Sequence, residues 1–144
     1  MIYRAKNEDA YTVAKLAVNM WKGSTVDEHA KGFEEMIADE DAAIFICSME
    51  NQPIGFAQCQ LRHDYVEGTD SSPVGYLEGI YIEEKYRKMG YAKELLAMCE
   101  KWAKEKGCSE FASDCELINE ASYEFHMKLG FTEANRIICF TKQL

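Results

Sequence analysis

A short basic segment that contains a glycine, at residues 87–92, is the part of this chain best suited to bind an anion. It follows an apolar, β-branched run at residues 74–82 and precedes residues 95–103, whose apolar side chains recur at helical spacing. This pattern predicts a buried strand, a tight turn and a helix. The first amides of a helix have no internal partners and lie at its positive dipole end, and Gly90 lets a ligand approach the backbone. The segment therefore predicts a phosphate site, with an ordinary turn carrying solvated cations as the alternative.

Two carboxylates occupy positions that could serve chemistry. Glu78 lies within the apolar strand at 74–82, and Asp114 ends a short strand predicted at 110–113. A carboxylate in such a run is costly unless it is paired, so Glu78 needs a partner. The carboxyl ends of parallel strands form the crevice in which α/β proteins bind ligands, and a bound ammonium would be a good partner there. A structural salt bridge is the alternative interpretation of Glu78.

The composition limits the classes of partner. The chain has 144 residues, of which 47% are hydrophobic, so we expect one globular domain over residues 1–144. Sixteen basic and 25 acidic residues give a formal charge of −9, which argues against a nucleic-acid or anionic-membrane partner and favours a small cationic ligand. High acidity for solubility alone is the other explanation.

The six cysteines and three histidines indicate no metal site. The cysteines are scattered without a Cys-x-x-Cys pair, and no histidine pairs with a cysteine at metal-binding spacing. The chain also lacks an apolar stretch of membrane-spanning length and an apolar signal core at residue 1. These features predict a reduced, cytoplasmic protein without a structural metal.

The elements that must position these residues follow from periodicity and turn residues. We expect helices at residues 7–20 (with Asn7 as N-cap), 27–38, 91–106 and 119–129, and strands at 1–5, 42–49, 54–62, 74–82, 110–113, 131–133 and 137–141. This order indicates an α/β (α+β) fold with a central mixed β-sheet and helices on both faces. The early strands should be antiparallel hairpins, and the strand at 74–82 should run parallel to the next.

Two further features could belong to a cleft. Trp21 falls at the joint between the first two helices, where it either faces a cleft or seals the helix pair as a core residue. Residues 63–73 form a polar loop longer than a tight hairpin needs, which often signals function.

Two motifs resemble those of the GNAT superfamily of N-acetyltransferases. The order Arg87-x-x-Gly90-x-Ala92 resembles its acyl-CoA loop, and residues 119–131 resemble its Asn-x-x-Ala-x-x-x-Tyr-x-Lys-x-Gly-Phe segment. Ser122 replaces the usual Ala, and His126 replaces the Tyr that often protonates the departing CoA thiolate. The resemblance covers the whole chain and implies a GNAT fold, with a sheet splayed between the central strand and the next parallel strand.

Within that superfamily, residues 65–69, 72–75, 77–81 and 110–114 look like those of the aminoglycoside 6′-N-acetyltransferases. The resemblance implies acetyl transfer from acetyl-CoA to the 6′-amine of aminoglycosides, and hence antibiotic resistance. By position it implies an acceptor site lined by Trp21, Tyr65, Glu78 and Asp114, and charge adds Asp70 and Glu133 near the crevice. The residues expected to hold acetyl-CoA are Ile80, Tyr81, Ile82, Arg87, Lys88, Met89, Gly90, Tyr91, Ala92, Lys93 and Asn119.

The mechanism expected from this arrangement is direct transfer in a ternary complex. A protonated amine must lose a proton before it attacks, and Glu78 is the candidate base, unless it and Asp114 only position the amine. No cysteine has the His and acidic neighbours that a covalent nucleophile requires. A GNAT enzyme acting on a polyamine or protein amine and a non-catalytic acyl-CoA-binding module are the alternatives. The apolar strand expected at 137–141 favours a homodimer.

Overall fold

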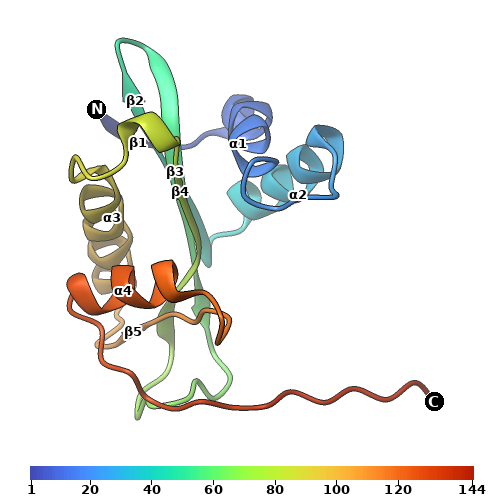
Figure 1. Cartoon of the computed structure of the whole chain (residues 1–144), viewed down its shortest axis with the longest axis vertical. Helices are drawn as coiled ribbons and strands as arrows, with labels where there is room; N and C mark the ends of the chain where they lie inside the picture. Colours follow the sequence, from blue (N-terminus) through green and yellow to red (C-terminus); the bar gives the residue numbers. More distant parts are fainter.

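The computed structural model describes all residues from 1 to 144 and has a five-stranded sheet. Helices cover both faces of this sheet (Figure 1). The strands are β1 (Ile2–Arg4), β2 (Ala42–Met49), β3 (Gln52–Arg62), β4 (Val74–Ile82) and β5 (Phe111–Ala112). The helices are α1 (Ala10–Ala17), α2 (Val26–Ala38), α3 (Tyr91–Glu105) and α4 (Glu120–Lys128). The sheet order is β1-β2-β3-β4-β5, with antiparallel pairs up to β4 and a parallel pair between β4 and β5. The expected mixed sheet is confirmed.

Each face of the sheet is covered by its own core. On one face α1 and α2 pack on side chains of β2 and β3, including Ile44, Ile46 and Phe56. On the other face α3 packs on the sheet through an apolar stripe, and α4 adds partly buried contacts to the same cluster (Figure 1). The stripe consists of Leu95, Leu96, Cys99, Trp102 and Ala103. No helix combines the length and the apolar character that a membrane span requires.

The element boundaries follow local hydrogen bonding. Thr25 and Glu28 form a reciprocal capping box that starts α2. The β2–β3 turn has positive φ at both Glu50 (48°) and Asn51 (65°), as a two-residue type I′ hairpin requires. The prediction of Asn7 as the first N-cap was wrong, because the Asp9 carboxylate accepts the Lys6 amide and residues 7–9 form a separate 3-10 turn.

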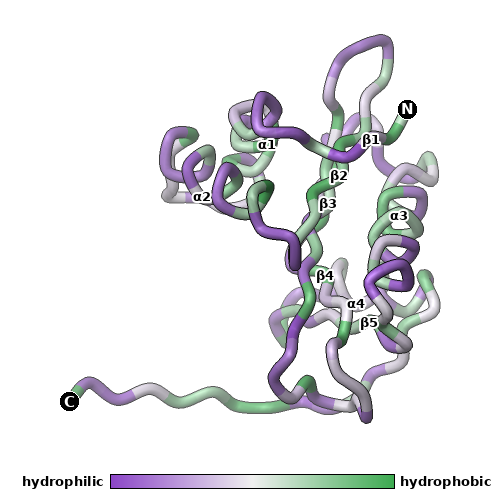
Figure 2. The backbone as a smooth tube through the Cα atoms, turned by 180° about the vertical axis from the view of Figure 1, so that it is seen from behind, coloured by the Kyte–Doolittle hydropathy of each residue, from purple (hydrophilic) through white to green (hydrophobic).

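The C-terminal segment contradicts the prediction of two final strands at 131–133 and 137–141, since residues 131–144 have no regular secondary structure. The first part of this segment is bound to the loop at 63–73, because Asn135 Nδ2 donates a hydrogen bond to Glu67 Oε1 at 2.9 Å. Beyond that point it runs away from the sheet and carries a hydrophobic stretch (Figures 1 and 2). Ile138 and Phe140 are 81% and 87% exposed. The apolar composition suits a strand, but no neighbouring strand pairs with it.

Candidate active site

The turn between β4 and α3 has the backbone that an anion site requires. Gly90 is the N-cap of α3 with a φ of +90°, and no atom lies within 4 Å of the position that a Cβ would occupy. Lys88 also has a positive φ, of 62°. Residues 87–90 are all exposed, so the first amides of the 15-residue helix α3 are open to a ligand.

Arg87 has a different surrounding from the one expected for a phosphate ligand. Its Nε donates to the carbonyl oxygen of Ile82 at 2.8 Å, and its guanidinium lies 5.8 Å from the centre of the Tyr81 ring. These contacts tie the turn to the end of β4. Lys88 and Lys93 make no ion pair either, so no carboxylate of the chain neutralises the cations of this segment.

The edge of β4 that faces β5 is open over its second half. The short strand β5 pairs only with Gly75 and Tyr76 of β4. On the β3 side, the Glu83 amide donates to Ile54 at 2.9 Å, and Tyr81 lies opposite Phe56. Because hydrogen-bonded pairs alternate along an antiparallel ladder, the backbone groups of Ile80 and Ile82 point to the open edge. This is the splay expected between the two strands.

A β-bulge in β4 determines where Glu78 points. Gln58 lies opposite Gly79 and Cys59 opposite Leu77, so Glu78 is the extra residue. Leu77 belongs to the core under α3, whereas a Cβ at Gly79 would meet Trp21 at 3.0 Å on the opposite face. The bulge thus interrupts the alternation of β4 and presents Glu78 on the face covered by α1 and α2.

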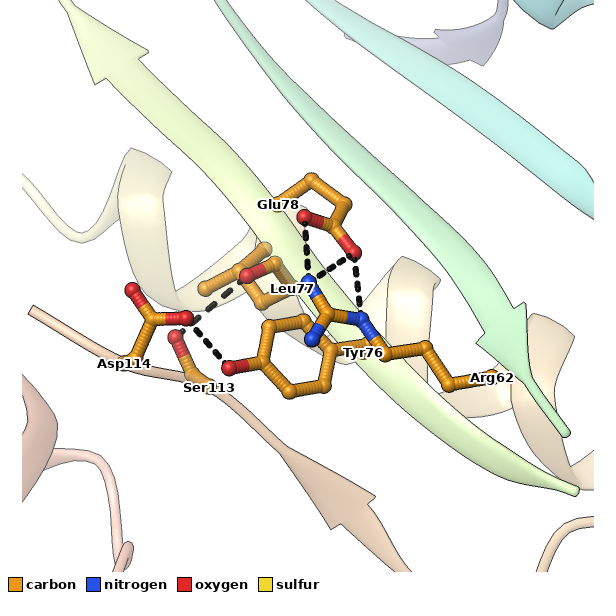
Figure 3. Close-up of polar contacts among 6 residues, drawn as sticks. All are labelled: Arg62, Tyr76, Leu77, Glu78, Ser113 and Asp114. Atoms are coloured by element: carbon orange, nitrogen blue, oxygen red, sulfur yellow. Dashed lines mark hydrogen bonds and ion pairs between the residues drawn. The ribbon is translucent and has the colours of Figure 1, made fainter. Parts of the chain in front are cut away.

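Four side chains, which we call the acidic cluster, meet on this face: Arg62, Tyr76, Glu78 and Asp114 (Figure 3). Arg62 Nε and Nη2 each donate to one oxygen of Glu78 at 3.0 Å, a bidentate pair. The guanidinium lies 3.4 Å from the centre of the Tyr76 ring, and the Tyr76 hydroxyl donates to Asp114 Oδ2. Burial and this hydrogen bond raise the pKa of Tyr76 well above its usual value, so the phenol stays a donor.

Trp21 closes the α1–α2 joint next to the bulge. Its ring stacks on His29 with 5.7 Å between centroids and packs against Phe56 at 6.4 Å. It is partly buried and borders the core, so it both seals the helix pair and lies over Gly79, beside Glu78 in sequence. A side chain at position 79 would displace this ring.

Three other residues expected at the acceptor site make no polar contact with the acidic cluster. Tyr65 is 77% exposed in the loop at 63–73. The Glu133 carboxylate pairs with Arg136, whose hydrogen bond lowers the pKa of Glu133. The Asp70 amide is bound by the Glu110 carboxylate, which also accepts from Ser71 and has a lowered pKa for that reason. A surface hollow of about 560 Å³ lies further along β4 than Glu78, with Asn19, Tyr81 and Glu83 in its lining.

His126 and Ser113 lie on the α3 side of the opening between β4 and β5. His126 Nδ1 is 2.6 Å from the Ser122 carbonyl oxygen, which can only accept, so Nδ1 carries a hydrogen. His126 Nε2 is 2.8 Å from Ser113 Oγ, and Ser113 Oγ is 3.4 Å from the Leu77 carbonyl oxygen. The single hydroxyl hydrogen of Ser113 serves one of these two neighbours at a time, so Ser113 joins the imidazole to the backbone of β4. Asn119 caps α4 by accepting the Ser122 amide at 3.1 Å.

Sequence reasoning missed Arg62, Tyr76 and Ser113. The available signal was the pairing of the strand at 54–62 with the strand at 74–82, because an antiparallel hairpin brings a cation at the end of the first strand near the second. The structure holds no group of three or more His, Cys, Asp or Glu side chains that could bind a metal ion.

The matching family model is the acetyltransferase (GNAT) family, over residues 6–131. The chain belongs to the GNAT family. It is 41% identical over 128 residues to the aminoglycoside N(6′)-acetyltransferase type 1 of Salmonella typhimurium, covering 89% of this chain and 88% of that protein. With the Serratia marcescens enzyme of the same name it shares 37% identity over 139 residues, covering 96% of this chain and 94% of that protein.

Solved structures agree over the full length of this GNAT chain. AAC(6′)-Iy in complex with the bisubstrate analogue CoA-S-monomethyl-acetylneamine superposes with a TM-score of 0.95 at 38% identity, covering 100% of this chain and 98% of that one. AAC(6′)-IG from Acinetobacter haemolyticus gives a TM-score of 0.93 at 33% identity, covering 100% and 99%. The expected GNAT fold is confirmed.

Proposed function

We propose that this protein is an aminoglycoside 6′-N-acetyltransferase, which transfers acetyl from acetyl-CoA to the 6′-amine of aminoglycosides and so confers resistance. The observation that carries the proposal is the full-length match, at 38% identity, to a structure solved with an analogue that joins CoA to an acetylated aminoglycoside. The acidic cluster supports it, because carboxylates that face a crevice suit a polycationic acceptor.

The backbone around α3 fits the binding of acetyl-CoA. The pyrophosphate would bind the first amides of α3 at Gly90, Tyr91 and Ala92, with Lys88 and Lys93 as counter-ions. Met89 takes part through its backbone, and Arg87 acts by holding the turn to β4. The pantetheine arm would pair with Ile80 and Ile82 at the open edge, as an added strand does. Acetyl-CoA supplies the acetyl thioester.

The acceptor amine is proposed to attack the thioester directly. Glu78 removes a proton from the ammonium, directly or through water, and the open-edge amides of Ile80 and Ile82 polarise the thioester carbonyl. If Glu78 and Asp114 only position the amine, water carries the proton instead. No cysteine forms a hydrogen bond with a histidine, and Cys59 Sγ is directed to the Ala43 carbonyl oxygen, so the cysteines give no support to a covalent acetyl-enzyme. Alignment of the amine and the thioester accounts for much of the rate.

His126 is proposed to supply the proton that the departing thiolate takes up. It occupies the position of the family's tyrosine. Since Nδ1–H is held by the Ser122 carbonyl, the proton would leave from Nε2 of the doubly protonated ring to Ser113 Oγ, which passes its own hydrogen toward the opening between β4 and β5. The ring is then left neutral with its hydrogen on Nδ1. Asn119 contributes by capping the helix that carries His126.

The protein is proposed to work as a homodimer in the cytoplasm. Exposed apolar side chains of the C-terminal segment, among them Ile137, Ile138 and Phe140, would be covered by a second copy. β5 pairs on one side only, which leaves a strand edge for such a segment. Removal of residues 137–144 should convert the dimer to a monomer in sedimentation velocity, and a wild-type protein that is monomeric at micromolar concentration would contradict this. The six free cysteines suit a reducing compartment.

A thiol-release assay tests the proposed function. Purified protein and acetyl-CoA are combined with kanamycin-, gentamicin- and neomycin-type acceptors, a polyamine and a protein amine. We expect CoA release with the aminoglycosides at a kcat/KM far above that with the other amines. Preference for the polyamine or the protein amine would assign another GNAT activity, and acetyl-CoA binding without any turnover would indicate a binding module.

A further inference from the structure

The carboxylate proposed to act on the acceptor already has a cation as its partner. Both oxygens of Glu78 accept hydrogen bonds from the Arg62 guanidinium, at 3.0 Å each (Figure 3). The guanidinium also covers the face of the Tyr76 ring, with 3.4 Å from its central carbon to the ring centre. Glu78 is therefore satisfied without an acceptor.

The exposure of the two side chains is unequal. The side chain of Glu78 is 19% exposed, whereas that of Arg62 is 38% exposed at the end of β3. Glu78 offers little surface beyond that covered by Arg62, so a second cation can reach its oxygens well only if the first one withdraws. Arg62 can withdraw toward water because its side chain already borders solvent.

We propose that Arg62 is a specificity-determining residue, an internal cation that the acceptor ammonium displaces from Glu78. This inference rests on the proposed function, since it concerns the same acceptor site. Every acceptor must break the same bidentate pair, so the displacement lowers the affinity of all of them. An acceptor with one ammonium gains a single ion pair in return, whereas a polycation also gains a pair at Asp114 and attraction from the acidic surface. The Arg62–Glu78 pair thereby excludes simple amines and admits polycationic ones.

Substitution of Arg62 tests this role. Arg62→Gln removes the internal competitor, and the unpaired Glu78 carboxylate then gains its cation from the acceptor. In calorimetric titrations with kanamycin at saturating CoA, we expect the Kd to fall about tenfold, which corresponds to one charge-assisted hydrogen bond. A sugar carrying a single primary amine, which we expect not to bind the wild-type protein measurably, should bind the variant. The affinity for CoA should not change.

Two further variants separate competition from a structural role. Arg62→Met keeps a long side chain at this position without the charge and should behave as Arg62→Gln. Thermal unfolding shows whether each variant is folded. Arg4→Gln, on β1 with a single hydrogen bond to the Ala42 carbonyl at 3.3 Å, removes an equal charge elsewhere and should leave the kanamycin Kd unchanged.

The outcomes distinguish this inference from the function on which it rests. Binding of kanamycin by the wild type, together with unchanged or weaker binding by folded Arg62→Gln and Arg62→Met, overturns the role of Arg62 alone. Absence of kanamycin binding by the wild type and the variants contradicts the proposed function itself. Tighter binding by Arg4→Gln as well would show that net charge, not the displaced pair, controls affinity.

Discussion

The two sides of β4 differ in the kind of atoms that they offer to a substrate. Its open edge and the turn into α3 offer backbone amides, the left-handed Gly90 and two lysines outside any ion pair. The acidic cluster offers charged side chains, and both of its carboxylates already have partners within the chain. On the proposed assignment, the first site binds its ligand without breaking a contact within the chain, whereas the second exchanges an internal cation for an external one.

This difference has a thermodynamic consequence. A backbone site changes little when its ligand binds, so its affinity depends on access and on the helix terminus. A site made of paired charges loses those pairs before it gains new ones, so its affinity is a difference between two sets of interactions. Substitutions at the two sites should therefore separate cleanly between affinity for acetyl-CoA and kinetics with the acceptor.

The largest effect is expected at Glu78. Glu78→Gln should lower kcat roughly 100-fold because a positioned base typically contributes at least that much. The Kd for acetyl-CoA should not change, which steady-state kinetics and calorimetry on the same sample can compare. Glu105→Gln, at the end of α3, is the matched control. An effect on acceptor KM alone would assign Glu78 to positioning of the amine.

The next effect concerns the backbone site. Gly90→Val should raise the Kd for acetyl-CoA about 30-fold, because its side chain would occupy the open space in front of the helix amides. Gly107→Val is a close control, since Gly107 follows the same helix with a φ of +92° and also has no atom within 4 Å of a Cβ. Both variants carry the same backbone strain, of about 1–2 kcal/mol. Equal loss of CoA affinity in the two would refute the assignment of this turn.

His126 tests whether the opening between the strands takes part in chemistry. His126→Phe should reduce kcat about tenfold with little change in either substrate's affinity, since only a proton for the thiolate is lost. His126→Tyr, which restores the family's residue type, should recover part of the rate. The rate of thiol release in the first turnover is measured for both proteins in a pre-steady-state experiment. If His126→Phe matches the wild type in this rate, the thiolate takes its proton from water.

A smaller effect is expected at Asp114, because its side chain lies in an exposed part of the chain and is screened by solvent. Asp114→Ala should raise the acceptor KM about fivefold and leave acetyl-CoA affinity unchanged. The difference between variant and wild type should shrink as salt is added. An unchanged acceptor KM with weaker acetyl-CoA binding would mean that the acceptor site lies elsewhere.

The smallest effect concerns the loop that carries Tyr65. Glu110→Gln should raise the acceptor KM about twofold, because it weakens the bonds that hold Asp70 and Ser71. The hydrogen bonds from Ser71 and Asp70 lower the pKa of Glu110, so its anchoring is complete above the ordinary carboxyl pKa and is lost as pH falls through the lowered value. The contribution of this anchoring is measured by comparing the acceptor KM of Glu110→Gln with that of the wild type at neutral pH. Glu94→Gln, an exposed position on α3, is the control.

Most of the fold and the backbone of the turn between β4 and α3 could be predicted from the sequence because they depend on local patterns. The strand, glycine-containing turn and helix at 74–106 can be predicted from hydrophobic periodicity and from one glycine that can adopt a left-handed conformation. Both features can be recognised in the sequence. The capping of α4 by Asn119 is similarly local. These features do not depend on contacts with residues far away in the sequence.

The acidic cluster could be predicted only in part, since its geometry depends on contacts between distant residues. Arg62 reaches Glu78 because of the β3–β4 register and the bulge, neither of which leaves a local signal. The segment at 137–141 has the composition of a strand, but a strand also needs a neighbour, which no local pattern supplies. The salt bridge considered as the alternative for Glu78 is present, and the further question is whether an acceptor displaces it.

The most direct test of the proposed function is the position of the acetyl group in the product. The purified protein is incubated with acetyl-CoA and two aminoglycosides that differ only in carrying an amine or a hydroxyl at the 6′ position. Mass spectrometry and NMR of the first product should show one acetyl group on the 6′-nitrogen, with one CoA released, and the 6′-hydroxyl compound should remain unmodified. Acetylation of another amine, or equal modification of both compounds, would contradict 6′-N-acetyl transfer by this site.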